Sequence, residues 1–118
     1  MVVTGRSLTP IDFAGLRILD YTAGRDLSAS LAVIDVPSGA RHAEAWSKRS
    51  DKFYLVVAGA ILFVLDGVET ELATDDFCLV PRGARFRYSN PATTPAKLVL
   101  VHVPTFDLHS EVFVEDQP

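Results

Sequence analysis

Apolar residues occur along the chain in short runs, and Gly, Pro, Asn or Asp residues separate one run from the next. The runs are rich in Val, Ile, Leu and Phe, which is typical of β-strands bounded by turns. No segment keeps an apolar helical period over three turns, so we expect little helix. The pattern predicts strands over residues 29–36, 52–58, 60–65, 68–73, 77–80, 85–89 and 97–103. Strands at this spacing indicate an all-β sandwich or barrel.

Turn chemistry supports this interpretation. Asp66-Gly67 joins two predicted strands, and a two-residue hairpin turn of this kind needs positive φ at both positions. Residues 10–17 are the one stretch in which we expect a single helical turn. Residues 113–118 resemble a tail, although Val112 and Phe113 could add an edge strand.

Length and composition are those of an ordinary globular domain. The 118 residues are 48% hydrophobic and 22% charged, and we expect one domain over residues 1–118, with its barrel core over residues 28–104. The formal net charge of −4 argues against nucleic acid or an anionic membrane as a partner. No apolar run resembles a signal peptide or is long enough to span a bilayer.

The chain has one cysteine, Cys78. A single chain therefore forms neither a disulfide nor a zinc site with several cysteines. The neighbours Phe77 and Leu79 indicate that Cys78 is a small buried hydrophobic residue and not a nucleophile. A reducing cytoplasm is the compartment that we expect for such a chain.

Residues 39–59 resemble the first of the two spaced motifs of the cupin family. Gly39 is followed after five residues by Ala45-Trp46-Ser47, after four more by Lys52, and after a further six by Gly59. Glycines at these places suit turns that need unusual φ.

Residues 75–90 resemble the second cupin motif. Asp75 stands where the family has its first glycine, and Pro81-Arg82-Gly83, Phe86 and Asn90 follow at the family's spacing. Asn90 suits a position that tolerates left-handed backbone geometry. The resemblance implies a cupin-type β-barrel, also described as a jelly roll or double-stranded β-helix, that binds a small molecule. We also expect a homodimer, because apolar strand edges such as residues 98–103 need cover.

The positions of the family's metal ligands hold other residue types. Cupins bind their metal through three His and one Glu, and here these positions are Ala45, Ser47, Lys52 and Phe86. Ala and Phe carry no ligand atoms, Ser is a weak ligand, and Lys is cationic at neutral pH. The metal-dependent chemistry of cupins is therefore not expected, and we predict no cofactor.

Strand alternation predicts a pocket around Lys52. If Lys52 points into the barrel, Tyr54 shares its face of the strand, and Phe86 and Tyr88 point inward from the facing sheet. An ammonium there could hold a carboxylate, phenolate or enolate, or act as a base with a lowered pKa. The candidate catalytic residues are Lys52, Tyr54, Tyr88 and His102, and the candidate substrate contacts are Ser47, Phe86 and Trp46.

A structural role for Lys52 is the alternative. The side chain could reach out of the barrel mouth, or pair with Asp51, Asp75 or Asp76. A cavity lysine without a partner is expensive to desolvate. If Lys52 faces the cavity without a partner, Lys52→Met would leave the melting temperature unchanged or raise it, while abolishing the binding of an anionic ligand.

The histidines leave further alternatives open. His42 and Glu44 form a His-x-Glu pair that could bind a metal with His102 as third ligand. Simple alternation puts residues 45 and 47 on the opposite strand face, outside this pair's reach. His102 lies in a run that is apolar on both faces, so we expect it to be buried, as a structural group or as a base in the pocket. Trp46 fits the core or an interface as well as a ligand contact.

Three functions follow from these observations. The first is a metal-independent cupin that acts on a small anionic or aromatic molecule by proton transfer, such as isomerisation, cyclisation or elimination. The second is a non-catalytic binding or sensing module, and the third is a structural domain whose barrel is filled by side chains. A metal-dependent cupin with non-standard ligands is a further alternative. An open cavity on the order of a few hundred Å³ with Lys52 at its wall would favour the first two.

The replacement of all four ligand positions makes a prediction about metal content. The purified protein should hold no stoichiometric transition metal, because the residues at these positions offer no adequate ligand set. Elemental analysis after removal of any affinity tag checks this. About one Fe, Mn, Ni, Cu or Zn per chain would contradict the prediction, and His42, Glu44 and His102 would then be the residues to test.

Overall fold

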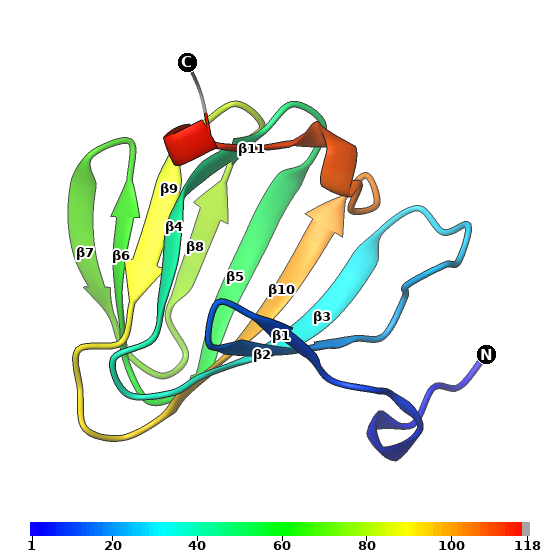
Figure 1. The fold of residues 1–118 in the computed structure, drawn as a ribbon, viewed down its shortest axis with the longest axis horizontal. Coiled ribbons are helices and arrows are strands. Elements are labelled where there is room, and N and C mark those ends of the chain that lie inside the picture. The colour runs from blue at the N-terminus through cyan, green and yellow to red at the C-terminus, as the bar shows by residue number, and fades with distance from the viewer. Residues whose placement is uncertain (117–118) are drawn as a thin grey trace.

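The computed structural model of the chain describes residues 1–116 and contains two antiparallel sheets that face each other (Figure 1). The six-stranded sheet has the order β1-β2-β3-β10-β5-β8, and the five-stranded sheet has the order β11-β4-β9-β6-β7. The strands are β1 (Ile11–Phe13), β2 (Leu16–Asp20), β3 (Ser30–Val36), β4 (Arg41–Ser47), β5 (Asp51–Ala58), β6 (Ile61–Leu65), β7 (Val68–Leu72), β8 (Phe77–Val80), β9 (Phe86–Ser89), β10 (Ala96–Val103) and β11 (Glu111–Phe113). Short 3₁₀ helices are η1 (Gly5–Ser7), η2 (Leu108–Ser110) and η3 (Val114–Asp116).

The core lies between the two sheets and follows from strand alternation. Tyr54 and Val56 of β5 are buried and face Phe86 and Tyr88 of β9, while the residues between them point outward. All seven predicted strands are present, with their ends shifted by no more than one residue. The all-β prediction is therefore confirmed, and so is the edge strand around residues 112 and 113.

The predicted helical turn over residues 10–17 is wrong. This segment is the hairpin β1–β2, which turns at Ala14 and Gly15 with φ angles of 51° and 89°. The hairpin extends the six-stranded sheet beyond β3 and is drawn in blue in Figure 1. The other predicted hairpin is confirmed, because Asp66 and Gly67 have φ angles of 47° and 81°.

The turn residues of the two motifs have specific structural reasons. Gly59 has a φ of 72°, and a Cβ at this position would lie 2.7 Å from the carbonyl oxygen of Pro95. Asp75 has a φ of 76°, so it adopts the left-handed conformation where the family motif has a glycine.

Asn90 acts through its side chain. Its amide nitrogen donates to the carbonyl oxygens of Val36 at 3.0 Å and Thr94 at 2.9 Å, and its carbonyl oxygen accepts from the Ala92 N–H at 3.0 Å. The side chain is fully buried. Asn90 is absent from the positive-φ residues of the described chain, so the expected left-handed geometry is wrong and hydrogen bonding explains the residue.

A β-bulge in β4 changes which residues face the barrel interior. His42 is opposite Tyr88 and Ala45 is opposite Phe86, so three steps along β4 match two steps along β9. The extra residue reverses the alternation, because two residues of the bulged strand oppose one on its partner. His42 therefore shares the inner face with Ala45 and Ser47, and the expectation that it lies on the opposite face is wrong.

The outer face of the six-stranded sheet is apolar. Leu31 of β3, Leu55 of β5, and Leu79 and Phe77 of β8 are between 38% and 54% exposed. Strand β10 lies between β3 and β5, so residues 98–103 do not form the free edge that the sequence suggested. Cys78 is half-buried on the inner side of β8, not fully buried. Within residues 1–116 no helix is long and apolar enough to cross a membrane.

Candidate functional site

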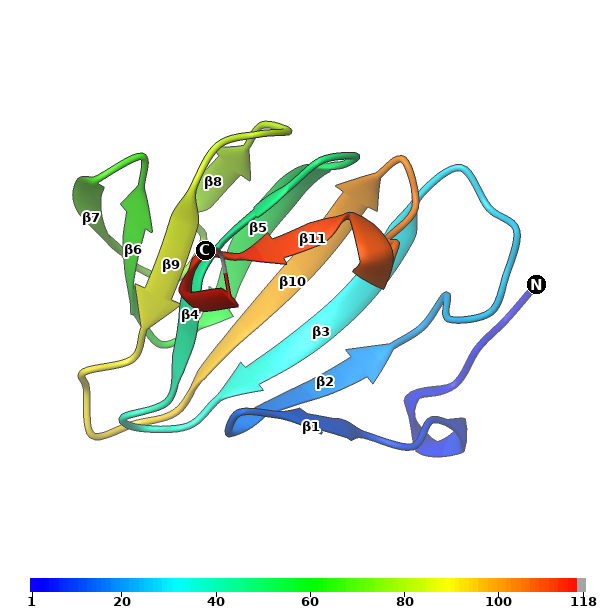
Figure 2. The same ribbon diagram turned by 45° about the horizontal axis from the view of Figure 1, so that its top comes forward.

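A cavity of about 330 Å³ opens between the β1–β2 hairpin, the inner face of the six-stranded sheet and the C-terminal segment. In Figure 2 the orange and red segment with η2 and β11 runs across the open barrel above β10 and β5. Most of the cavity wall is apolar, including Ile11, Phe13, Leu16, Ile34, Leu100 and Phe113. The wall also includes His42, Lys52, Tyr54, Tyr88, His102 and Glu111. Contacts among these side chains and with the Phe86 ring link them into one group, which we call the polar end of the cavity. Side chains therefore do not fill this barrel, which disfavours the purely structural alternative.

Lys52 lies at the cavity wall as predicted, but it has partners. Its side chain is 3% exposed, and its Nζ donates a hydrogen bond to Glu111 Oε1 in a buried ion pair. Nζ also lies 2.9 Å from His102 Nε2 and 5.4 Å from the centre of the Phe86 ring. Burial lowers the pKa of Lys52, and Glu111 opposes this shift. The ammonium is thus held in place and is not a free anchor for an anion.

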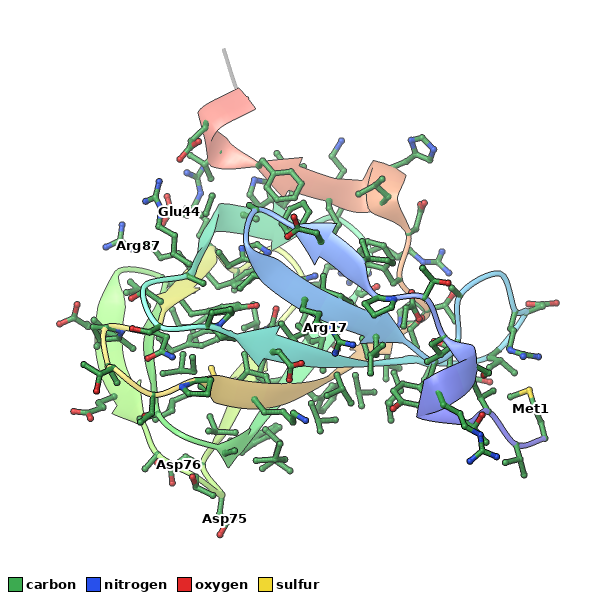
Figure 3. All side chains as sticks on the ribbon, turned by 60° about the horizontal axis from the view of Figure 1, so that its bottom comes forward. Met1, Arg17, Glu44, Asp75, Asp76 and Arg87 are labelled. Carbon is green, nitrogen blue, oxygen red and sulfur yellow. The ribbon has the colours of Figure 1, made fainter. Side chains whose placement is uncertain are left out.

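The partners that the sequence suggested for Lys52 are wrong. Asp51 accepts a hydrogen bond from the Arg82 N–H at 2.8 Å. Asp75 and Asp76 belong to the turn before β8, at the lower end of the molecule in Figure 3. The partner Glu111 comes instead from the C-terminal strand, 59 residues away in the chain.

His102 is buried behind Lys52. Burial lowers its pKa to about 3, and the charge of Lys52 adds to the effect, so the ring is neutral at physiological pH. The Lys52 ammonium can only donate, so His102 Nε2 is the acceptor of their hydrogen bond. The lone pair that a base would use is thereby occupied, and this favours a structural role for His102.

Among the cavity histidines, His42 is the one whose Nε2 lone pair has no hydrogen-bond partner within residues 1–116. Its Nδ1 lies 2.6 Å from the Ala43 carbonyl oxygen, so Nδ1 carries the proton and Nε2 keeps its lone pair. The ring packs against Phe86 and Tyr88, with centroids 4.9 Å and 5.2 Å away, and against Phe113 at 6.1 Å. Burial lowers the pKa of His42 to about 4, so the imidazole is neutral above that pH.

Tyr54 and Tyr88 lie beside each other at the polar end of the cavity, with ring centroids 5.7 Å apart. Burial raises the pKa of both phenols above the ordinary value. Both therefore stay protonated and can donate a hydrogen bond to a ligand. The Tyr88 hydroxyl is buried and has no hydrogen-bond partner among residues 1–116.

The three predicted substrate contacts do not line the cavity. Ser47 Oγ accepts hydrogen bonds from the Arg49 N–H at 3.1 Å and the Ser50 N–H at 2.9 Å, so it stabilises the turn after β4. Phe86 is 1% exposed, and its ring packs against His42 and lies beside the Lys52 ammonium. Trp46 points to the other face of β4, because Ala45 and Ser47 are the buried residues on either side of it.

The chain does not offer a metal site at this position. The four ligand positions hold Ala45, Ser47, Lys52 and Phe86, and the Lys52 ammonium is held by a carboxylate. The described part of the chain contains no group of three or more His, Cys, Asp and Glu side chains that could hold a metal ion. Glu44 lies with Arg87 on the outer side of the five-stranded sheet (Figure 3), away from the cavity, so His42, Glu44 and His102 do not form one site.

Comparison with known proteins identifies the family. The family model described as "Cupin domain" matches residues 32–102. The chain belongs to the cupin family. The predicted resemblance and the cupin-type barrel are therefore confirmed, and the matched segment runs from β3 to β10.

Two curated relatives come from Streptomyces. This cupin is 33% identical to Protein SchB of Streptomyces halstedii over 82 residues, which are 70% of this chain and 59% of that protein. It is 31% identical over 72 residues to the tetracenomycin polyketide synthase protein TcmJ of Streptomyces glaucescens, covering 61% of this chain and 48% of that protein. The chain thus spans about half the length of these relatives.

Solved structures of Streptomyces Pac13, described as a nucleoside dehydratase, have the same fold. One superposes with a TM-score of 0.84 at 24% identity and covers 97% of this cupin and 90% of Pac13. A Pac13 variant with uridine superposes with a TM-score of 0.82 at 25% identity, covering 94% of this cupin and 88% of the variant. The likeness extends over the β1–β2 hairpin and the C-terminal segment, because almost the whole chain is covered.

Sequence reasoning missed Glu111 and the true place of His42. Glu111 lies in a segment that the sequence marked only as a tail with a short edge strand, and its charge gave no sign of a partner in β5. His42 was assigned to the wrong face because no glycine or proline in β4 indicates the bulge in the sequence. The alternation Glu-Val-Phe in residues 111–113 was the one available signal, since it puts Glu111 and Phe113 on the same face.

The ion pair changes the expected effect of Lys52→Met. The substitution leaves the Glu111 carboxylate, 10% exposed, without its counter-charge, so we now expect a loss of about 3 kcal/mol in the free energy of unfolding. The double variant Lys52→Met/Glu111→Leu removes both charges and should recover most of this loss. Lys97→Met is the control, because Lys97 is half-exposed and 3.6 Å from Asp35, and it should cost less than about 1 kcal/mol. Urea unfolding measures all three, and an unchanged midpoint for Lys52→Met would show that the pair contributes nothing.

Proposed function

We propose that this cupin binds a small organic molecule in the cavity and catalyses a metal-independent proton transfer with His42 as the base. The observation that carries the proposal is the hydrogen bond from His42 Nδ1 to the Ala43 carbonyl oxygen at 2.6 Å. This bond fixes the tautomer and leaves Nε2 as a proton acceptor beside the two buried phenols. His42 thus replaces Lys52 and His102 as the candidate base.

The proposed step forms an enolate or its equivalent. His42 Nε2 takes a proton from a carbon next to a carbonyl group, and the electron pair of the broken C–H bond moves toward the carbonyl oxygen. A phenol O–H of Tyr54 or Tyr88 donates to that oxygen as its negative charge develops. The protonated His42 then returns the proton to a different carbon in an isomerisation or to a departing hydroxide in an elimination. In a cyclisation the enolate carbon bonds to a second carbonyl carbon of the ligand, and His42 returns the proton to the alkoxide formed there.

The relatives support this reaction class. Pac13 is described as a nucleoside dehydratase, and removal of water is an elimination. Solved Pac13 structures with uridine include variants in which one histidine or one of two tyrosines is replaced. His42, Tyr88 and Tyr54 pack side by side at the polar end of this cavity, so one histidine and two tyrosines also lie together here.

A non-catalytic binding module is the second candidate. The large apolar part of the cavity wall favours it, since such walls supply affinity without chemistry. Turnover by the protein, as opposed to binding alone, separates the two candidates.

Proton exchange at carbon tests the proposed function without knowledge of the natural substrate. The probe is 2-tetralone in D₂O, a compact ketone whose acidic C–H groups exchange by way of an enolate. The protein should accelerate deuterium uptake, measured by proton NMR, and His42→Gln should lower the acceleration by about 10²-fold or more. His109→Gln is the matched control because His109 is exposed, and it should retain the full rate. Exchange that is no faster than in buffer, or that survives His42→Gln, would refute the proposal.

The pH dependence of this exchange follows from the lowered pKa of His42. The base is active in its neutral form, and its pKa is lowered from 6.5 to about 4. The protein-catalysed rate should therefore be level between about pH 5.5 and 7.5 and decline only as the pH falls through about 4. A half-loss of rate near pH 6.5 would mean that an exposed histidine is the base.

We also propose that two copies of the chain associate through the apolar outer face of the six-stranded sheet. Leu55 lies near the middle of this face, between Phe77 of β8 and Val99 of β10. Two-fold association is the commonest way in which soluble proteins cover such a surface.

Sedimentation at micromolar concentration tests the dimer. The wild-type protein should sediment as a dimer and Leu55→Glu as a monomer, because the new charge would be buried in the interface. Val68→Glu is the control, since Val68 is 67% exposed on β7 of the other sheet. A monomeric wild-type protein would exclude the proposed association.

A further inference from the structure

The one positive charge at the cavity wall, on Lys52, is compensated. Among the described residues that line it, the charged side chains are Lys52, Glu111 and Asp20, and the two histidines are neutral at physiological pH. Lys52 and Glu111 form one ion pair, and the carboxylate of Asp20 accepts hydrogen bonds from Thr22 at the rim. A ligand anion would therefore meet no uncompensated positive charge in the cavity.

The Lys52 ammonium is also enclosed by its neighbours. The Glu111 carboxylate and His102 Nε2 are its hydrogen-bond partners, the Phe86 ring lies over it at 5.4 Å, and the side chain is 3% exposed. An anionic group could reach Lys52 only by displacing Glu111, which would leave that carboxylate buried and unpaired. The geometry therefore argues against the anionic ligand that the sequence suggested.

Away from the polar end, the cavity offers few free hydrogen-bonding groups. The Ser30 hydroxyl already accepts from the Phe106 N–H at 2.7 Å, and the Asp20 carboxylate is bound to Thr22. The remaining wall is made of aliphatic and aromatic side chains such as Ile18, Ile34 and Leu100. A molecule with polar groups along its whole length, such as a nucleoside, would lose hydrogen bonds to water here without replacement.

Two buried polar atoms on side chains that line the cavity have no hydrogen-bond partner within residues 1–116, namely the Tyr88 hydroxyl and Glu111 Oε2. A carboxylate oxygen can only accept and a phenol can donate, so Glu111 suits a ligand hydroxyl or enol and Tyr88 suits a ligand carbonyl. His42 Nε2 lies within the same group of side chains.

We infer that Glu111 neutralises the Lys52 ammonium at the cavity wall and thereby makes this cupin select an uncharged ligand, apolar over most of its surface, with a hydroxyl or carbonyl group at one end. Glu111 is thus a specificity-determining residue contributed by the C-terminal strand. The inference rests on the proposed function only in taking the same cavity as the substrate site. It concerns binding at equilibrium, so loss of the proton exchange with binding intact would refute the proposed reaction and leave this inference standing.

Two probes of similar shape and different charge, together with one neutral polar probe, test the selection. Isothermal titration calorimetry of the full chain at pH 7 uses 2-naphthol, which is neutral, 2-naphthoate, which is anionic, and uridine, which is neutral and polar. The wild-type protein should bind 2-naphthol at least about tenfold more tightly than either of the others. Glu111→Gln leaves the Lys52 charge uncompensated at nearly constant shape, so the preference for 2-naphthol over 2-naphthoate should fall by about tenfold or reverse.

Two further variants keep the test decisive. Glu71→Gln changes the net charge equally at an exposed position of β7 and should leave the preference unchanged. If Glu111→Gln does not fold, Lys52→Met/Glu111→Leu removes both charges and should still prefer 2-naphthol to 2-naphthoate. The inference is wrong if the wild-type protein binds 2-naphthoate or uridine as tightly as 2-naphthol, or fails to bind 2-naphthol at millimolar concentration. An unchanged preference in a folded Glu111→Gln would also overturn it.

Discussion

A lysine ammonium that is 3% exposed cannot remain in a barrel without a counter-charge and hydrogen-bond acceptors. In this cupin both come from the partners of Lys52, namely Glu111 of β11 and His102 of β10. The ion pair joins the middle of the six-stranded sheet to the C-terminal segment, which lies across the open barrel (Figure 2). Because Phe113 and Leu108 on this segment are part of the cavity wall, the pair also determines the shape of the cavity.

The β4 bulge has a comparable effect on the chemistry. Without the extra residue, His42 would point away from the interior, and the described cavity wall would keep only His102, whose Nε2 lone pair accepts from Lys52. With it, the imidazole lies among Phe86, Tyr88 and Phe113, which exclude water and lower its pKa. Bulges often redirect a side chain next to a functional site. The bulge in β4 redirects His42 and locally interrupts the hydrogen bonds between β4 and β9.

This chain keeps the turns of the cupin fold but not the metal-ligand residues of the family. Gly59, Asn90 and the left-handed Asp75 keep the turns of the two cupin motifs, while the metal-ligand positions carry residues that pack or form an ion pair. An imidazole, two phenols and a carboxylate line the largely apolar cavity instead. The proposed function rests on this set, because these groups can form hydrogen bonds and transfer protons.

The sequence by itself determined the barrel, because strand periods, the Asp66-Gly67 turn and motif spacing are local properties of the chain. It also placed Lys52 and Tyr54 on the inner face and Tyr88 opposite them, since strand alternation holds in β5 and β9. Strict alternation predicted the wrong face for His42, because the bulge in β4 leaves one extra residue opposite β9 and turns His42 inward. The ten-residue stretch around Ala14-Gly15 became a hairpin because β3 offers it a strand to pair with. Only the tertiary structure decided that Lys52 has a counter-charge, because its partner Glu111 is 59 residues away and no local pattern links the two.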